Sequence, residues 1–300
     1  MAVGQSGGEP SFVEPIAPSE SGPTVLRIAL GAQLRRLREA SGVTREDAGY
    51  AIRASHAKIS RLELGRVGYK ERDVADLLTL YGVHYQARRE AFLDLARQAN
   101  SPGWWHQYND VVQNWFELYV GLEQAASVIR TYEVQFLPGL LQTRDTTRAI
   151  LLAGHLESAE EVERRVDLRM RRQEVLTRPD PLSLWAVVDE SALRRPVDGR
   201  QIMADQLRHL LELSDLPNIT IQALRYDSRG HASANGPFSI LRFEAGDLPD
   251  VVYLEQLTSA LYLDKPADVD FYRAAMSRLS VRAESPEKTQ SLLLEMMKGQ

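Results

Sequence analysis

The sequence predicts an α+β protein overall, in which a small all-helical part precedes a larger part with helices and a mostly antiparallel sheet. Between residues 25 and 100 the apolar residues recur at i, i+3 and i+4, the spacing of helices buried on one face. After Pro181, short runs rich in β-branched and aromatic residues alternate with turn-forming residues, as strands do. A length of 300 residues fits about two domains. We therefore expect a tail over residues 1–24, a five-helix domain over 25–100 and an α+β domain over 101–300.

Residues 1–24 are expected to form a disordered tail. They contain eight glycines and prolines among serines and acids. Such a segment buries too little apolar surface to offset the entropy lost on ordering. The segment is as well explained by an extension without function as by a regulatory arm.

The first domain is expected to begin with a helix over 27–40, which Gly42 ends. The following segment, residues 44–65, predicts two short helices joined by a tight turn. Thr44 and Ser55 can each cap a helix, because their side-chain oxygens accept hydrogen bonds from backbone N–H groups of the first turn. Two more helices are expected over 71–81 and 85–99, and Pro102 and Gly103 end the domain.

The second short helix exposes donors that suit double-stranded DNA. A helix fits the major groove of B-DNA, where side chains reach the edges of the bases. We predict base contacts from His56, Ala57, Lys58 and Arg61. The flanking positions and the loop over 66–70 are placed to meet backbone phosphates, which set register without reading sequence. We predict phosphate contacts from Arg45, Ser55, Arg66, Tyr69 and Lys70. For each single residue of the loop over 66–70, a solvated side chain is the alternative.

The charge distribution agrees with a DNA-binding first domain on an acidic body. The net charge of the chain is −5. Residues 25–99 nevertheless carry 14 Lys and Arg against 9 Asp and Glu, whereas residues 100–300 carry 22 against 29. Basic charge is therefore concentrated around the predicted helix pair.

From Leu30 to Val83 the chain resembles the phage-repressor-like, xenobiotic-response-element class of helix-turn-helix regulators. The resemblance is carried by the leading helix LGAQLRRLREASG, the helix pair, the phrase ISRLELGR and the ending LLTLYGV. It departs from the pattern at Arg53, where the turn usually has glycine, and at Arg45, where glutamine is usual. The resemblance implies that Arg38 pairs with Glu63 and fixes the angle between helices. The alternative is that both side chains are solvated.

The second domain opens with six aromatic residues between Trp104 and Tyr119, which predict core or a subunit interface rather than stacking on bases. Helices are expected over 118–129, 140–153 and 159–176. Four or five largely antiparallel strands should follow, in the runs LSLWAVVDE, NITIQALRY, GPFSILRFE, VVYLEQL and SALYLD. A helix over 201–213 should separate the first two runs, and helices over 267–282 and 286–298 should end the chain.

This second part is similar to the domain of unknown function that follows such DNA-binding domains in actinobacterial regulators typified by WhiJ-like proteins. The phrases YEVQFLPGLLQT, ITIQALRYDSRGHASANGPFSILRF and VVYLEQLTSALYLDK carry the likeness. The resemblance implies a regulator and, as its partner, a small BldB-like protein. A small-molecule effector is the other expectation, and the loop over 229–237 is one place where the domain could receive either.

Other chemistries are not expected. The chain has no cysteine, and its six histidines do not fall at metal-ligand spacing. It has no phosphate-binding loop, dinucleotide fingerprint or nucleophile elbow. We therefore expect no enzyme, no cofactor and no metal. No apolar run approaches the length that crosses a bilayer, so we expect no membrane partner and a cytoplasmic location.

The sequence thus predicts a sequence-specific DNA-binding transcriptional regulator that acts as a homodimer, because one recognition helix reads only a few base pairs. The aromatic residues after Trp104 are the expected apolar surface for the dimer. The alternative is an antitoxin-like interaction module that binds and neutralises a small protein partner.

Overall fold

The computed structural model describes residues 22–154, 158–195, 197–228, 236–244 and 248–298. The chain divides into two compact units between Ser101 and Pro102. In the described part of the chain, the first unit contains helices and no strand, whereas the second combines helices with a six-stranded sheet, so the predicted α+β class is confirmed. Most of the loop over 229–237 lies outside the described residues.

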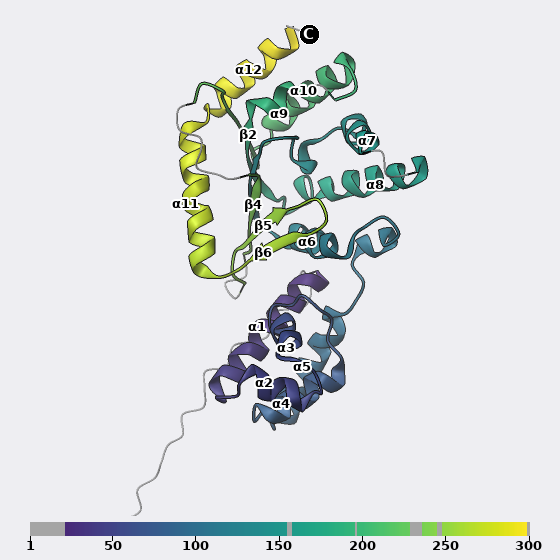
Figure 1. Ribbon diagram of the computed structural model, residues 1–300, viewed down its shortest axis with the longest axis vertical. Helices are drawn as coiled ribbons and strands as arrows, with labels where there is room; N and C mark the ends of the chain where they lie inside the picture. The colour runs from purple at the N-terminus through teal and green to yellow at the C-terminus, as the bar shows by residue number, and fades with distance from the viewer. Residues whose placement is uncertain (1–21, 155–157, 196, 229–235, 245–247, 299–300) are drawn as a thin grey trace, which may run out of the picture. The chain divides into compact units, whose positions relative to one another are not determined.

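Over residues 22–101 the first unit folds into five helices (Figure 1). They are α1 (Pro23–Ala40), α2 (Arg45–Ala51), α3 (His56–Glu63), α4 (Glu71–Leu80) and α5 (Gln86–Ala99). Helix α1 begins four residues before the predicted start, inside the segment assigned to the tail. Proline suits the first position of a helix, and Thr24 and Val25 are buried, so these residues belong to the helical unit. Residues 1–21 of the predicted tail lie outside the described part of the chain.

Both predicted helix caps are present. The Thr44 side chain accepts from the backbone N–H of Asp47 at 3.1 Å, and the Ser55 side chain accepts from that of Lys58 at 3.3 Å. Each bond satisfies a donor that the helix itself leaves unpaired. The core beneath these helices is formed by Leu30, Leu34, Ile59, Leu62, Leu77 and Leu78, all at most 2% exposed.

The turn between α2 and α3 contains a residue in the left-handed region. Arg53, at the position where the resembled class usually has glycine, has φ 54°. The turn is also tight, because a Cβ added to Gly49 would lie 2.7 Å from the carbonyl oxygen of Ala54. The chain therefore keeps the geometry of the turn and accepts a strained residue in it, at roughly 1 kcal/mol.

Replacing Arg53 by glycine should raise the free energy of unfolding by up to about 1 kcal/mol, because the backbone strain disappears. The greater freedom that glycine gives the unfolded chain offsets part of this gain. Gly42→Ala is the matched control. Gly42 has φ 69° and an open surrounding, so alanine there adds only strain and should lower stability by about 1 kcal/mol. Urea unfolding measures both. A loss of stability in Arg53→Gly would contradict the assigned turn.

The second unit alternates short helices and strands along the chain. Its elements are η1 (Trp104–Tyr108), α6 (Asn114–Ala125), β1 (Val128–Glu133), η2 (Gly139–Leu141), α7 (Arg144–Ala153), α8 (Ala159–Arg172), η3 (Gln173–Leu176), β2 (Ser183–Asp189), α9 (Glu190–Arg194), α10 (Arg200–Ser214), β3 (Ile219–Leu224), β4 (Phe238–Arg242), β5 (Val251–Glu255), β6 (Ala260–Leu263), α11 (Pro266–Arg282) and α12 (Pro286–Lys298). The five predicted strand runs correspond to β2 to β6.

Strand β1 is not among the predicted strands, and its first two residues were wrongly predicted as the end of a helix over 118–129. The strands lie in the order β3-β2-β1-β4-β5-β6, so β1 is central. It pairs in parallel with β2, where Thr131 is opposite Ala186, and antiparallel with β4, where Thr131 is opposite Ser239. The β2–β3 pair is parallel, whereas the β4–β5 and β5–β6 pairs are antiparallel. The sheet is therefore mixed, with three antiparallel pairs out of five.

Helices cover both faces of the sheet. Figure 1 shows α11 on one side and α6 to α10 on the other. On the α11 side, Tyr132, Phe238 and Val252 of the sheet pack with Met276 and Leu279 of the helix. Among the described residues, no helix is long and apolar enough to cross a membrane.

The aromatic residues after Trp104 mostly pack within their own unit. Trp105 and Tyr119 are buried. Trp104, Tyr108 and Phe116 pack on the cluster that contains Trp105, Val112, Val120 and Leu168. This aromatic cluster is thus core, one of the two interpretations that the sequence permits.

Candidate nucleic-acid interface

Helix α3 presents a polar face opposite its buried face. Ile59 and Leu62 are at most 2% exposed and pack in the core, whereas His56, Ala57 and Arg61 are exposed. The spacing of the buried residues fixes the rotation of the helix, so the exposed ones share the outer side. Ser55, the cap of the helix, is also exposed. These side chains can reach a groove that receives the helix.

Lys58 has a partner that the sequence did not reveal. Its Nζ lies 2.6 Å from Oδ2 of Asp73 on α4, and the Asp73 side chain is only 12% exposed. The ammonium is therefore directed to α4 rather than held free on the outer face. A base or phosphate must compete with Asp73 for this lysine.

Removing the charge of Asp73 should strengthen binding to duplex DNA of any sequence. In Asp73→Asn the ammonium of Lys58 becomes available for a phosphate. The slope of log affinity against log salt concentration should therefore become more negative by about one, the value for one added phosphate contact. Fluorescence anisotropy over a range of salt concentrations measures this slope.

Asp76→Asn is the matched control, because Asp76 lies on the same helix and pairs with the exposed Arg72 at 3.8 Å. It removes the same charge without releasing Lys58. Equal changes in the two variants would show that net charge, and not Lys58, determines the effect.

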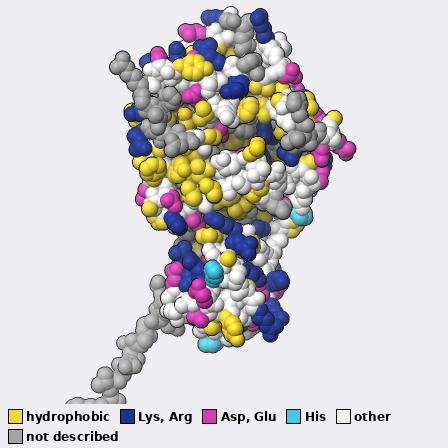
Figure 2. Space-filling view, in the orientation of Figure 1, with side chains coloured by type: hydrophobic (Ala, Val, Ile, Leu, Met, Phe, Trp, Pro, Cys, Tyr) yellow, Lys and Arg dark blue, Asp and Glu magenta, His cyan; other side chains and the backbone are white. Residues whose placement is uncertain are grey.

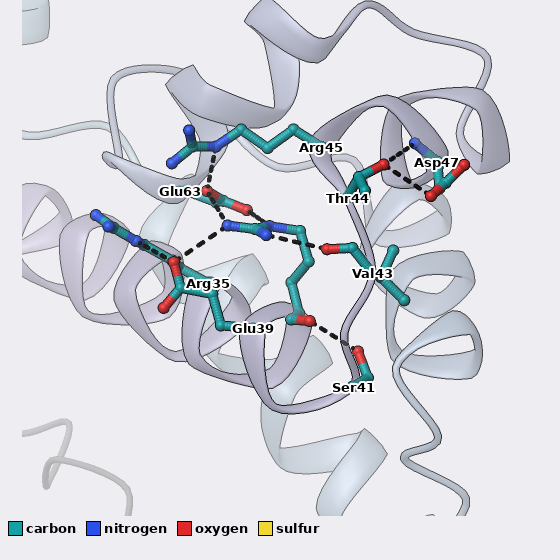
Figure 3. A network of polar contacts seen from close by, with 9 residues as sticks. Arg35, Glu39, Ser41, Val43, Thr44, Arg45, Asp47 and Glu63 are labelled. Carbon is teal, nitrogen blue, oxygen red and sulfur yellow. Dashed lines mark hydrogen bonds and ion pairs between the residues drawn. The ribbon is translucent and has the colours of Figure 1, made fainter.

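Three of the predicted phosphate donors have exposed or partly exposed cationic groups. Arg66 and Lys70 are exposed. Arg66 lies in the loop between α3 and α4, and Lys70 is the N-cap residue of α4. Arg45 is held by Glu63, since its Nε donates to Glu63 Oε2 at 3.0 Å, and its side chain remains 40% exposed. In Figure 3 the two terminal nitrogens of Arg45 point away from Glu63. Glu63 thus orients Arg45 without using its outer nitrogens.

The predicted phosphate contact of Tyr69 is wrong. Tyr69 is 4% exposed, and its hydroxyl lies 2.7 Å from the carbonyl oxygen of Leu62 and 2.8 Å from that of Arg27. Its backbone N–H donates to the side chain of Asn100 at 2.9 Å. Burial raises the pKa of the hydroxyl above its ordinary value. Tyr69 therefore joins α1, α3 and the end of α5, and it has no free donor for DNA.

Arg38 and Glu63 are paired in the structure (Figure 3). Arg38 Nε donates to Glu63 Oε1, Arg38 Nη2 lies 3.2 Å from Oε2, and Nη1 donates to the carbonyl oxygen of Val43 at 3.0 Å. Arg38 is 7% and Glu63 5% exposed. The hydrogen bond to Glu63 raises the pKa of Arg38 above its ordinary value. The pair fixes α1 against α3 and so the angle of the exposed face.

Glu63→Ala should lower the free energy of unfolding of the helical unit by about 3–5 kcal/mol, because Arg38 is left buried and without its carboxylate. Glu39→Ala is the matched control, since Glu39 contacts Arg35 and Arg38 but has a side chain that is 51% exposed. It should cost at most about 1 kcal/mol. Urea unfolding followed by circular dichroism compares the two. Similar losses would mean that burial does not determine the strength of the pair.

The helical unit carries the excess of positive charge. It holds the 14 Lys and Arg against 9 Asp and Glu of residues 25–99. Figure 2 shows Lys and Arg side chains on the visible face of this unit. A positive surface attracts DNA before any specific contact forms.

The second unit has a buried ion pair of its own and a small hollow. Arg172 donates to both oxygens of Glu123 at 2.7 Å, which joins α8 to α6. A hollow lies between Phe136, Ile150 and Met203, with room for about one water molecule. That hollow is too small for an organic effector.

Comparisons with known proteins divide the chain as the structure does. Residues 29–92 match a family described as a helix-turn-helix domain. This match indicates DNA binding and a role in transcription regulation. Residues 116–295 match the family described as domain of unknown function DUF5753. No curated protein and no solved structure matches the chain. Because the second match covers more than half of the residues of this chain, the chain belongs to the DUF5753 family, and it carries a helix-turn-helix domain before the matched region.

Proposed function

We propose that the protein is a sequence-specific transcriptional regulator of the phage-repressor-like class that binds its operator as a homodimer. The supporting observation is the outer face of α3, where His56, Ala57 and Arg61 are exposed while Ile59 and Leu62 anchor the helix in the core. Arg61 is the donor best suited to read guanine in the major groove. Arg45, Arg66 and Lys70 then contact phosphates on either side.

In this proposal the second unit joins two copies and receives a signal. A DNA-binding dimer needs only the helical unit and a short dimerising element, yet about two hundred residues follow. The expected signal is a small BldB-like protein, as in the resembled WhiJ-like regulators, or a small molecule. The signal must bind the DNA-competent and DNA-incompetent forms with different affinity, since equal affinity changes nothing. No catalytic step is part of the proposal.

Arg61→Ala should weaken operator binding by about 1–3 kcal/mol and relax the choice of sequence, because a base contact is lost. Lys70→Ala is the matched comparison. It should weaken binding to all DNA sequences alike, because Lys70 is assigned to a phosphate. The slope of log affinity against log salt concentration should become shallower by about one. Footprinting on the DNA upstream of the gene identifies the operator, and anisotropy then compares specific with unrelated duplexes.

If Arg61→Ala discriminates between sequences as its parent does, the placement of α3 is wrong. The antitoxin-like alternative makes a different prediction. It expects high affinity for a small protein partner and no preference for the upstream fragment over unrelated DNA.

A further inference from the structure

Helix α11 is apolar on two opposite sides. Its inner side packs on the sheet through Val269, Met276 and Leu279, which are at most 5% exposed. Its outer side carries Phe271, which is 65% exposed, and Val281, which is 86% exposed. A helix on the surface of a monomer usually has one polar side. The outer side of α11 therefore resembles a surface that is buried in an assembly.

The exposed outer residues follow the spacing of a helix pair. At alternating steps of four and three they are Ala267, Phe271, Ala274, Arg278 and Val281, and each is exposed. Steps of four and three keep one stripe of a helix facing a partner helix along its whole length. We call these five residues the α11 stripe. Its middle residue, Ala274, is small enough to allow close approach of a second backbone.

Two charged residues, Asp270 beside the stripe and Arg278 within it, indicate which helix would cover the stripe. Asp270 lies four residues before Ala274 and Arg278 lies four residues after it. Both are exposed, and the contact of Asp270 with Arg273 is long, at 3.5 Å. A second α11 that runs antiparallel, with the two-fold axis at Ala274, sets Asp270 of each copy against Arg278 of the other. A parallel pair would set like charges together.

The same antiparallel arrangement also matches the sizes of the apolar residues. With the axis at Ala274, Val281 meets Ala267 of the second copy and Phe271 meets its Ser277. Phe271 and Val281, the two large apolar residues of the stripe, thus each face a small residue. A two-fold axis makes every such contact occur twice, as in the isologous interfaces of most homodimers.

We propose that two copies of the protein pair antiparallel through the α11 stripe, and that this contact forms the homodimer. The inference rests on the dimeric regulator proposed above and names its interface. It also replaces the earlier expectation that the aromatic residues after Trp104 join the subunits, since the structure places most of them in a core. A helix of 17 residues is about 25 Å long, so the contact is smaller than a standard interface. We therefore expect dissociation in the micromolar range.

A charge exchange in the full-length protein tests the pairing. Asp270→Arg sets arginine against Arg278 of the second copy, and Arg278→Asp sets aspartate against Asp270. Each single variant should dimerise at least tenfold more weakly than the parent, and the double variant D270R/R278D should recover the parental value. Sedimentation equilibrium between 1 and 100 μM measures the dissociation constants.

Two further variants distinguish the loss of a stripe contact from the general effect of placing a charge on an exposed apolar position. Val281→Glu should abolish the dimer, whereas Leu257→Glu should leave it unchanged, because Leu257 is 96% exposed in the turn between β5 and β6 and lies outside the stripe. Circular dichroism confirms that each variant is folded. A monomeric parent, or a dimer that persists in both Asp270→Arg and Val281→Glu, would overturn the inference.

Operator binding, measured on the same variants, keeps this inference distinct from the proposed function. A parent that binds its operator as a dimer while the α11 variants remain dimeric supports the regulator and refutes the interface. A parent whose dimer responds to the α11 variants, but which shows no preference among DNA sequences, supports the interface and refutes the regulator.

Discussion

The geometry of the helical unit depends on the carboxylate of Glu63. This one side chain accepts from Arg38 on α1 and from Arg45 on α2 while it lies at the end of α3. Three helices therefore meet at a single buried anion. Apolar packing alone allows helices to slide or rotate slightly, whereas bidentate hydrogen bonds fix direction. The exposed face of α3 is held at a set angle because its last residue is tied to both preceding helices.

The sequence predicted those elements whose limits are marked by local signals. The helix expected over 201–213 is observed as Arg200–Ser214, and the last helix was expected and found over 286–298. Strand β1 was missed because it follows α6 after two residues and continues its apolar pattern. Only pairing with β2 and β4, which come much later in the chain, makes this segment a strand.

The candidate site was predictable to the extent that it depends on helical periodicity. The buried Ile59 and Leu62 determine that His56 and Arg61 face outward, and spacing alone reveals this. Contacts between distant residues were not accessible in the same way. Lys58 and Asp73 are 15 residues apart, and Tyr69 is buried by contacts with the ends of α1 and α5. The pairing of Arg38 with Glu63 could be predicted only because the resemblance to the helix-turn-helix class implied it.

The central position of β1 has a consequence for the order in which the chain can fold. Val128 pairs with Ser183 and with Arg242, so the sheet joins residues about 55 and 114 positions apart. Contacts between such distant residues form slowly, whereas helices that contact near neighbours form fast. During synthesis β1 emerges long before β4 and leaves its ladder unpaired on that side. We expect the helical unit to have folded before the antiparallel strands of the sheet are synthesised. The nascent chain therefore forms its helix-turn-helix before it forms the core of the second unit.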